Sequence, residues 1–157
     1  MRRDPTTLPG RPCSLAAALE VVGDRWALLA VREVMFGNHQ FSQIARNTGA
    51  PRDRLAARLK TLVEAGVLER RPAGQPGRFG DGYHLTDAGR ELSPVMRALL
   101  TWGDRWAVTA PPMRMRHHDH PFTPRTVCDT CGEPVRDGDV TREMLAPQWT
   151  MEGHSDG

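Results

Sequence analysis

Residues 41–86 read FSQIARNTGAPRDRLAARLKTLVEAGVLERRPAGQPGRFGDGYHLT, and this stretch decides the fold. Apolar residues at helical spacing predict a short helix over Phe41–Asn47. After the turn Thr48-Gly49-Ala50, Pro51 opens a second helix at a position where its missing N–H costs little. Four apolar residues of this helix fall at the i, i+4, i+7 and i+8 positions and are expected to face the core: Leu55, Leu59, Leu62 and Val63.

Two short strands are expected after the second helix. Val67–Arg71 and Tyr83–Leu85 are predicted to pair across Pro72–Gly82, a loop with four glycines and two prolines. The order helix, turn, helix and hairpin is typical of a winged helix-turn-helix, a mainly α fold with a small β-hairpin wing (α+β). Such a fold carries out no chemistry, because it places one helix in a DNA groove and a basic loop beside it.

Three further helices are expected around this segment. Ser14–Val22 and Asp24–Phe36 show helical patterns on either side of Gly23. The second of these is apolar around most of its circumference, which favours a central place in a core or a dimer interface. A last helix is predicted from the cap residue Thr86 to about Val108, with Pro94 inside it as a point where it kinks or restarts.

Composition and segment character predict one folded domain with tails. The chain has 157 residues, of which 39% are hydrophobic, and no apolar run approaches the ~20 residues that span a bilayer. The N-terminus lacks the apolar core of a secretory signal, so we expect a cytoplasmic protein with no membrane partner. The predicted parts are a flexible N-terminus (1–12), a winged-helix DNA-binding and dimerisation domain (13–110), a linker (111–127) and a small Cys-x-x-Cys appendage or disordered tail (128–157).

Positive charge is concentrated in the predicted helix-turn-helix. Residues 41–71 contain seven basic and three acidic residues, a balance of +4, whereas the whole chain carries only +2. Lys60 is the only lysine, so codon usage in a GC-rich genome accounts for much of the arginine excess. The clustering on one predicted motif nevertheless favours contact with double-stranded DNA.

The chain also carries a series of different short motifs, one after another. They are an N-terminal Cys13, Gly23-Asp24-Arg25-Trp26, Arg32-Glu33 with Gly37 and Phe41, Leu55, Arg58-Leu59, Leu62, Glu64-x-Gly66-Val67-Leu68, Tyr83-x-Leu85-Thr86-x-x-Gly89-x-x-Leu92 and Trp102. In this order they resemble the HxlR family of bacterial winged-helix transcriptional regulators, over about Cys13 to Trp106. The wing departs from the family pattern, because Arg78 lies five residues before Tyr83 instead of in a Pro-Arg pair close before the return strand.

The resemblance implies a function and an assembly. We expect a sequence-specific DNA-binding regulator, a repressor, that binds a pseudo-palindromic operator. We expect it to be a homodimer formed through its N- and C-terminal helices. A small-molecule or redox signal is expected to release it or alter its binding.

The residues expected to contact DNA lie at the start of the first helix of the motif, along the exposed side of the second helix and in the wing. They are Ser42, Gln43, Arg52, Arg54, Arg58, Lys60, Arg71 and Arg78. Arg52 and Arg54, at the N-terminal end of the second helix, are expected to meet base edges. Arg58 and Lys60 are expected to meet phosphates. The alternative for each isolated arginine is a solvated helix face.

Cys13 is a candidate sensor of redox state or electrophiles. The resemblance aligns it with a cysteine that sensing members of the family use. A helix N-terminus lowers the pKa of a thiol and so makes it more nucleophilic. The alternative is a small, inert residue beneath a dimer interface.

A small aromatic or electrophilic effector is a second expected input. A cavity between the helix at 24–36 and the C-terminal helix, rich in aromatic residues and bearing one or two charges, suits a planar aromatic compound. Its candidate lining residues are Arg25, Trp26, Met35, Met96, Trp102 and Trp106. The alternative is that these residues form core and dimer packing.

Cys128-Asp-Thr-Cys131-Gly132 has the spacing of a zinc knuckle. A closed zinc site needs four ligands and the chain has no second Cys-x-x-Cys, so nearby histidines would complete it. The candidate ligands are Cys128, Cys131, His118 and His120, with His117 and His154 as further candidates. A vestigial knuckle or a local disulfide is the alternative. A zinc-binding protein whose C-terminal Cys/His group senses metal or makes protein contacts is therefore the alternative function.

No motif points to catalysis. The Cys/His group lacks a glutamate in a general-base pattern such as His-x-Glu. The chain also lacks a phosphate loop, a Gly-x-Ser-x-Gly elbow and a Rossmann fingerprint. We therefore expect a protein that is not an enzyme and requires no cofactor. A winged helix used only for protein contact is disfavoured by the basic bias of the second helix.

Overall fold

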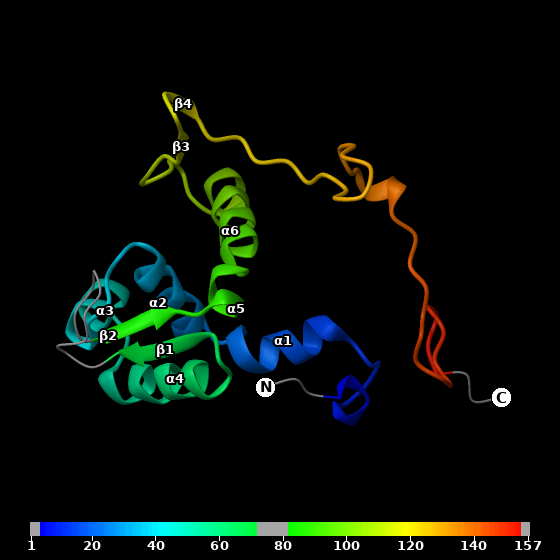
Figure 1. The fold of residues 1–157 in the computed structure, drawn as a ribbon, viewed down its shortest axis with the longest axis horizontal. Helices are drawn as coiled ribbons and strands as arrows, with labels where there is room; N and C mark the ends of the chain where they lie inside the picture. Colours follow the sequence, from blue (N-terminus) through cyan, green and yellow to red (C-terminus); the bar gives the residue numbers. More distant parts are fainter. Residues whose placement is uncertain (1–3, 72–81, 155–157) are drawn as a thin grey trace. The chain divides into compact units, whose positions relative to one another are not determined.

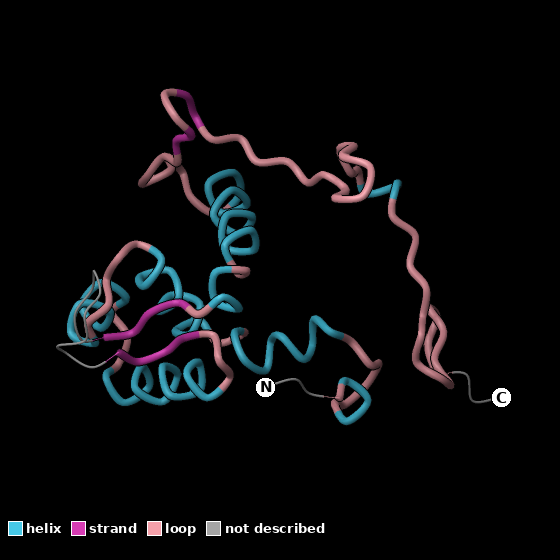
Figure 2. Tube along the Cα trace, viewed as in Figure 1, coloured by secondary structure: helices cyan, strands magenta, loops and turns pink. Residues whose placement is uncertain are grey.

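A computed structural model describes residues 4–71 and 82–154. Figures 1 and 2 show the order of its helices and strands. The elements are α1 (Ser14–Val22), α2 (Arg25–Met35), α3 (Phe41–Thr48), α4 (Arg52–Glu64), β1 (Leu68–Arg71), β2 (Gly82–Leu85), α5 (Asp87–Arg90), α6 (Ser93–Trp106), β3 (Arg116–His117) and β4 (His120–Pro121), with short 3-10 helices at Pro5–Thr7 and Asp137–Asp139. The chain divides into two units, residues 1–93 and 94–157. None of the described helices is both long and apolar enough to cross a membrane.

The first unit is organised around α2, which packs against α1, α3, α4 and β2. Asp24 begins this helix, since its carboxylate accepts hydrogen bonds from the backbone N–H groups of Trp26 and Ala27 at 2.8 and 3.3 Å. Three of the four predicted core positions of α4, Leu55, Leu59 and Leu62, are fully buried, and Val63 is partly buried against the same cluster. Helical periodicity therefore located the central helices and the buried face of α4.

β1 and β2 form the predicted antiparallel hairpin, with Leu68 opposite Leu85 and Arg71 opposite Gly82. β1 contacts α4 and β2 contacts α2, so the hairpin lies against both helices (Figure 1). The winged helix-turn-helix fold is confirmed. Of the predicted wing loop, residues 72–82, the part 72–81 lies outside the described residues, and Gly82 belongs to β2.

The stretch predicted to be helical from residue 87 to about 108, with a kink or a restart at Pro94, contains two helices, so the structure shows the restart. Thr86 caps α5 as expected, its hydroxyl accepting from the backbone N–H of Gly89 at 3.1 Å. α5 has only four residues, and α6 restarts at Ser93 and ends at Trp106. Pro94 lies in the first turn of α6, where its missing N–H breaks no helical bond.

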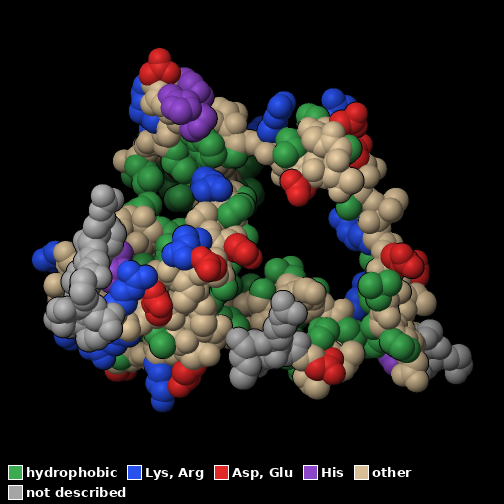
Figure 3. Space-filling view, viewed as in Figure 1, with side chains coloured by type: hydrophobic (Ala, Val, Ile, Leu, Met, Phe, Trp, Pro, Cys, Tyr) green, Lys and Arg blue, Asp and Glu red, His purple; other side chains and the backbone are tan. Residues whose placement is uncertain are grey.

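The second unit, residues 94–157, contains α6, the two-residue strands β3 and β4, and tight turns. Met96 is the only buried hydrophobic residue among its described residues, 94–154. Figure 3 shows hydrophobic side chains along α6 and imidazoles gathered at the β3–β4 hairpin. The predicted linker thus contains a small hairpin of its own.

Candidate nucleic-acid interface

The turn between α3 and α4 is built from side-chain hydrogen bonds and one glycine. Gly49 follows α3 with a φ of +68°, a left-handed conformation that suits a residue without Cβ. The Thr48 hydroxyl donates to the carbonyl of Ile44 at 2.7 Å and accepts from the N–H of Ala50 at 3.2 Å. Pro51, the cap residue of α4, directly follows this turn. The hydrogen bonds of the turn therefore fix the orientation of α4 relative to α3.

Burial of the leucine face leaves the opposite face of α4 exposed. Arg52, Arg54, Arg58 and Lys60 all lie on that exposed surface. Arg54 makes no ion pair within residues 4–71 and 82–154. A guanidinium that is exposed and not paired with a carboxylate is available for a bidentate contact with a base edge or a phosphate.

The start of α3, the start of α4 and the hairpin surround a hollow of about 560 Å³. Arg52 lies over the ring of Phe41, 4.9 Å from its centroid, and both line this hollow. Ser42 also lines it, as predicted for a phosphate contact, and so does Arg70. Arg70 is exposed and was missing from the predicted set, although its place in β1 between Glu69 and Arg71 puts it on the opposite side of the strand from both.

The basic residues farther along α4 already have acidic neighbours. Arg58 Nε lies 3.2 Å from the carboxylate of Asp24, the residue that caps α2. Lys60 Nζ lies 3.8 Å from Glu64, one turn ahead on the same helix. Both side chains are well exposed, so these pairs contribute little to stability and leave hydrogen-bonding capacity open to solvent.

The remaining residues predicted to contact DNA lie in the wing and in α3. Arg71 pairs with Glu69 on the same strand, with an Nε–Oε1 distance of 2.9 Å. Gln43 accepts from the backbone N–H of Gln40 at 3.3 Å and so caps α3. Arg78 lies outside the described residues.

A contact that the sequence did not reveal joins the hairpin to the loop before α3. The rings of His39 and His84 stack with centroids 4.2 Å apart, and His84 is buried. The N–H of Tyr83 donates to the carbonyl of His39 at 2.8 Å. Gly82 lies so close to that carbonyl that a Cβ would meet it at 2.4 Å. The hairpin is thereby held at a fixed place beside the helix-turn-helix.

Glu33 is a second feature that sequence reasoning missed, because it is a buried carboxylate (3% exposed) in the middle of α2. Arg32 donates to one oxygen at 2.7 Å, and Asn38 and Asn47 donate to the other at 2.8 and 2.9 Å. Burial by itself would raise the pKa of Glu33, but the hydrogen bonds from Asn47, Arg32 and Asn38 outweigh it and hold the pKa below its usual value. The ionised carboxylate links α2 to the end of α3.

The candidate sensor and pocket residues are distributed over both units. Cys13 is a free, partly exposed thiol immediately before α1. Trp26 and Met35 pack against the buried cluster of the first unit. Trp102 and Trp106 line a pocket whose lining residues all lie between Pro94 and Thr126. Of the six predicted lining residues, only these two tryptophans border that pocket.

The Cys-x-x-Cys segment forms a tight turn with free thiols at Cys128 and Cys131. The N–H of Gly132 donates to the carbonyl of Cys128 at 2.7 Å. Hydrogen bonds from the backbone amides of Cys131 and Thr130 lower the pKa of the Cys128 thiol below its usual value. Within residues 4–71 and 82–154, no three His, Cys, Asp or Glu side chains are grouped as a metal site. The two thiols are therefore not joined by His118 or His120 in this structure.

Comparisons with known proteins agree with this geometry. A family model described as HxlR-like helix-turn-helix matches residues 21–110. An HTH-type transcriptional regulator of Mycobacterium tuberculosis is 43% identical over 136 residues, which cover 83% of this chain and 84% of the relative. The crystal structure of PA1607 matches with a TM-score of 0.71 and 33% identity, over 85% of this chain and 95% of that one. The redox regulator HypR in its oxidised form matches with a TM-score of 0.53 and 25% identity, over 59% and 96%.

Proposed function

Because the chain belongs to the HxlR-like helix-turn-helix family and is a transcriptional regulator, we propose that it is a repressor that binds a pseudo-palindromic operator as a homodimer. The observation that carries the proposal is the face of α4 opposite its buried leucines. There Arg52 and Arg54 are exposed at the N-terminal end of the helix. Arg52 lines a hollow that Ser42 and Arg70 also border. On this proposal the protein acts in the cytoplasm, at chromosomal DNA.

Each residue of the interface has a distinct proposed role. Arg52 and Arg54 read base edges in the major groove, where a guanidinium matches the two acceptors of guanine. Arg58 and Lys60 contact phosphates, which fix the position of the helix without reading sequence. The hollow beside Arg70 receives the sugar-phosphate backbone.

The remaining proposed contacts come from the ends of the motif. Ser42 and Gln43 support the same phosphates from α3. Arg71 and Arg78 serve the wing, whose loop lies outside the described residues.

Exposed apolar side chains on two helices support the homodimer. Leu15 and Leu19, one turn apart on α1, are 65% and 53% exposed. Val95 and Leu99, one turn apart on α6, are each 49% exposed. Exposed apolar stripes of this kind mark protein interfaces. Light scattering should give the mass of a dimer for the wild type and of a monomer for Leu19→Asp; a wild-type monomer would contradict the proposed assembly.

Selection from random double-stranded DNA, followed by footprinting on the intergenic region beside the gene, tests operator binding. We expect enrichment of two inverted half-sites about 10–10.5 bp apart from centre to centre, because each recognition helix of a dimer meets a successive major groove. A pool that shows no enriched sequence would contradict the proposal. Transcription of the adjacent gene should rise when the regulator is deleted; a fall would make it an activator.

Cys13 is proposed as a redox or electrophile input. It is a partly exposed free thiol before α1, and a structural relative at 25% identity is a redox regulator. Quinone or peroxide should weaken operator binding by the wild type and by Cys128→Ser, but not by Cys13→Ser. An equal loss of operator binding in Cys13→Ser would show that Cys13 is not the sensor.

We also propose that Cys128 and Cys131 bind zinc, which metal analysis tests directly. The tight turn and the lowered pKa of the Cys128 thiol favour a thiolate, which is the form that binds metal. Metal analysis of the purified protein should find zinc in the wild type and none in Cys128→Ser, whereas Cys13→Ser should match the wild type. Metal-free wild-type protein with full operator affinity would end the proposal.

A further inference from the structure

Two ridges of side chains run along α6 and differ in chemistry. Pro94, Ala98, Trp102 and Trp106 recur every four residues and form an apolar ridge. Arg97, Thr101 and Arg105 also recur every four residues and form a cationic ridge beside it. Residues four apart stack along one side of a helix, so the two ridges lie next to each other over the length of α6.

The segment 122–126 lies across from these ridges and completes a pocket. Residues of both ridges and of 122–126 line a cavity of about 740 Å³. Phe122 is held there by a hydrogen bond from its N–H to the carbonyl of Met115 at 3.0 Å, and its ring centroid lies 5.9 Å from the Arg97 guanidinium. This volume falls in the range of ~300–1,000 Å³ that small-molecule sites occupy.

The charge of the pocket is uncompensated. Its lining residues include three arginines and no aspartate or glutamate. In the described part of the chain, neither Arg97 nor Arg105 lies within salt-bridge distance of a carboxylate. Arg105 instead lies over the ring of Trp106, 5.0 Å from its centroid. A site with cations beside aromatic faces attracts a ligand that brings both a negative charge and a flat ring.

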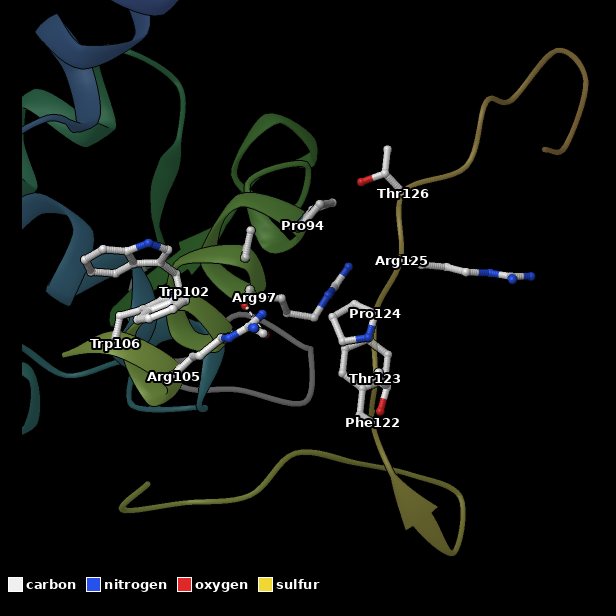
Figure 4. Close-up of a pocket in the computed structure, with 12 residues that line it drawn as sticks. Pro94, Arg97, Trp102, Arg105, Trp106, Phe122, Thr123, Pro124, Arg125 and Thr126 are labelled. Carbon is white, nitrogen blue, oxygen red and sulfur yellow. Dashed lines mark hydrogen bonds between the residues drawn. The ribbon is translucent and has the colours of Figure 1, made fainter. Parts of the chain in front are cut away.

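Figure 4 shows how the three arginines differ in direction. Arg97 projects from α6 toward segment 122–126, whereas Trp102 and Trp106 lie on the side of α6 away from that segment (Figure 4). Arg105 lies beside Trp106 and, like Arg97, lines the cavity. The Arg125 side chain points away from α6. Two of the three guanidinium groups therefore face the cavity, and the third serves as an internal control.

We propose that this pocket binds a planar aromatic carboxylate. The ring lies against Phe122, and the carboxylate accepts hydrogen bonds from Arg97 or Arg105. The site differs from the predicted effector cavity, because it is formed within residues 94–126 and includes neither Trp26 nor Met35. It stands whether or not the protein binds an operator, since ligand binding is measured without DNA.

Isothermal titration of the full chain with 2-naphthoate tests the proposal, with neutral 2-naphthamide as the matched probe. We expect one site per chain and amide binding weaker by about tenfold or more, because the amide lacks the charge that pairs with guanidinium. Arg97→Gln or Arg105→Gln should weaken naphthoate binding by about tenfold, and Arg125→Gln by less than about twofold. Circular dichroism should show equal helix content in all variants, because Arg105 and Arg125 are exposed and Arg97 is only half-buried.

Three results would overturn the proposal. The first is no naphthoate binding by the wild type up to about 1 mM, the weak end of the affinity scale. The second is equal binding of the acid and the amide, which would show that burial of the ring, and not the negative charge, drives binding. The third is a loss in Arg125→Gln as large as in Arg97→Gln and Arg105→Gln, which would indicate attraction by net charge without a defined site. Weakening by either pocket arginine together with an unaffected Arg125→Gln supports the site.

Discussion

The two faces of α4 differ in environment and in role: the inner face is buried in the core, and the outer face is exposed and basic. The inner face, Leu55, Leu59 and Leu62, is fully buried and joins the hairpin and α2 into one core. The outer face carries Arg52 and Arg54, which are exposed and lack a carboxylate partner in the described ranges. Substitutions on the inner face should therefore change stability, and substitutions on the outer face should change DNA affinity.

The largest effect is expected for the inner face. Leu59→Ala should lower the free energy of unfolding by about 2–5 kcal/mol, because it removes buried methyl groups and leaves a cavity. Urea unfolding followed by circular dichroism measures this change. Ala56→Gly on the exposed side is the control and should cost about 1 kcal/mol, the difference in helix propensity. A Leu59→Ala loss no greater than that of the control would show that the inner face does not stabilise the fold more than the exposed side.

Glu33 extends the inner network beyond hydrophobic contacts. Glu33→Ala should lower the free energy of unfolding by roughly 3 kcal/mol, because Arg32, Asn38 and Asn47 lose a buried partner. Glu33→Gln keeps the shape of the side chain and should cost less. Equal stability of wild type and Glu33→Ala in urea would contradict the role of this carboxylate.

Acid should weaken the same network. The folded pKa of Glu33 is lowered, so its ionised form contributes stability that is fully present above the unfolded value of about 4.3 and is lost as pH falls through the folded value. The stability difference between wild type and Glu33→Gln should therefore shrink below about pH 4. A constant difference from pH 6 to pH 3 would show that ionisation of Glu33 does not stabilise the fold.

Arg54 tests the outer face with a smaller effect. Arg54→Ala should weaken operator binding by roughly 1–3 kcal/mol and relax the preference at one base position. Its midpoint in urea should equal that of the wild type, because the side chain is exposed and unpaired within the described residues. Gel-shift titration on operator variants measures the change, and unaltered affinity would remove Arg54 from the interface.

The smallest effect is expected at Arg58, which pairs with Asp24 and is also proposed to contact a phosphate. Arg58→Ala should weaken binding to all DNA sequences alike and reduce the salt slope by about 1. Stability should fall by less than about 1 kcal/mol, because the pair with Asp24 is exposed to solvent. A sequence-selective loss would move Arg58 from the phosphate group to the base-reading group.

Local patterns predicted the elements but not the contacts between distant residues. The period of the leucines in α4 and the caps Asp24 and Thr86 were visible in sequence, because each depends on neighbours within a few positions. Sequence alone does not decide whether the last helix kinks or restarts, because Pro94 is compatible both with a kink and with a first turn.

The long-range contacts were not predictable in the same way. Glu33 meets Asn47 fourteen residues later, and His39 stacks on His84 across the fold. The pocket of residues 94–126 was likewise missed, since its far wall comes from a segment predicted to be a linker. Such pairs depend on tertiary placement, which periodicity and spacing do not encode.

The proposed function depends on DNA binding by the outer face of α4. The most direct test is the affinity of the wild type for its own upstream DNA and for unrelated DNA over a range of salt concentrations. We expect tighter binding to the upstream DNA at every salt concentration, with log K falling linearly with log salt at a slope of about −4 or steeper. Equal affinity for both DNAs, or binding that salt does not weaken, would contradict it.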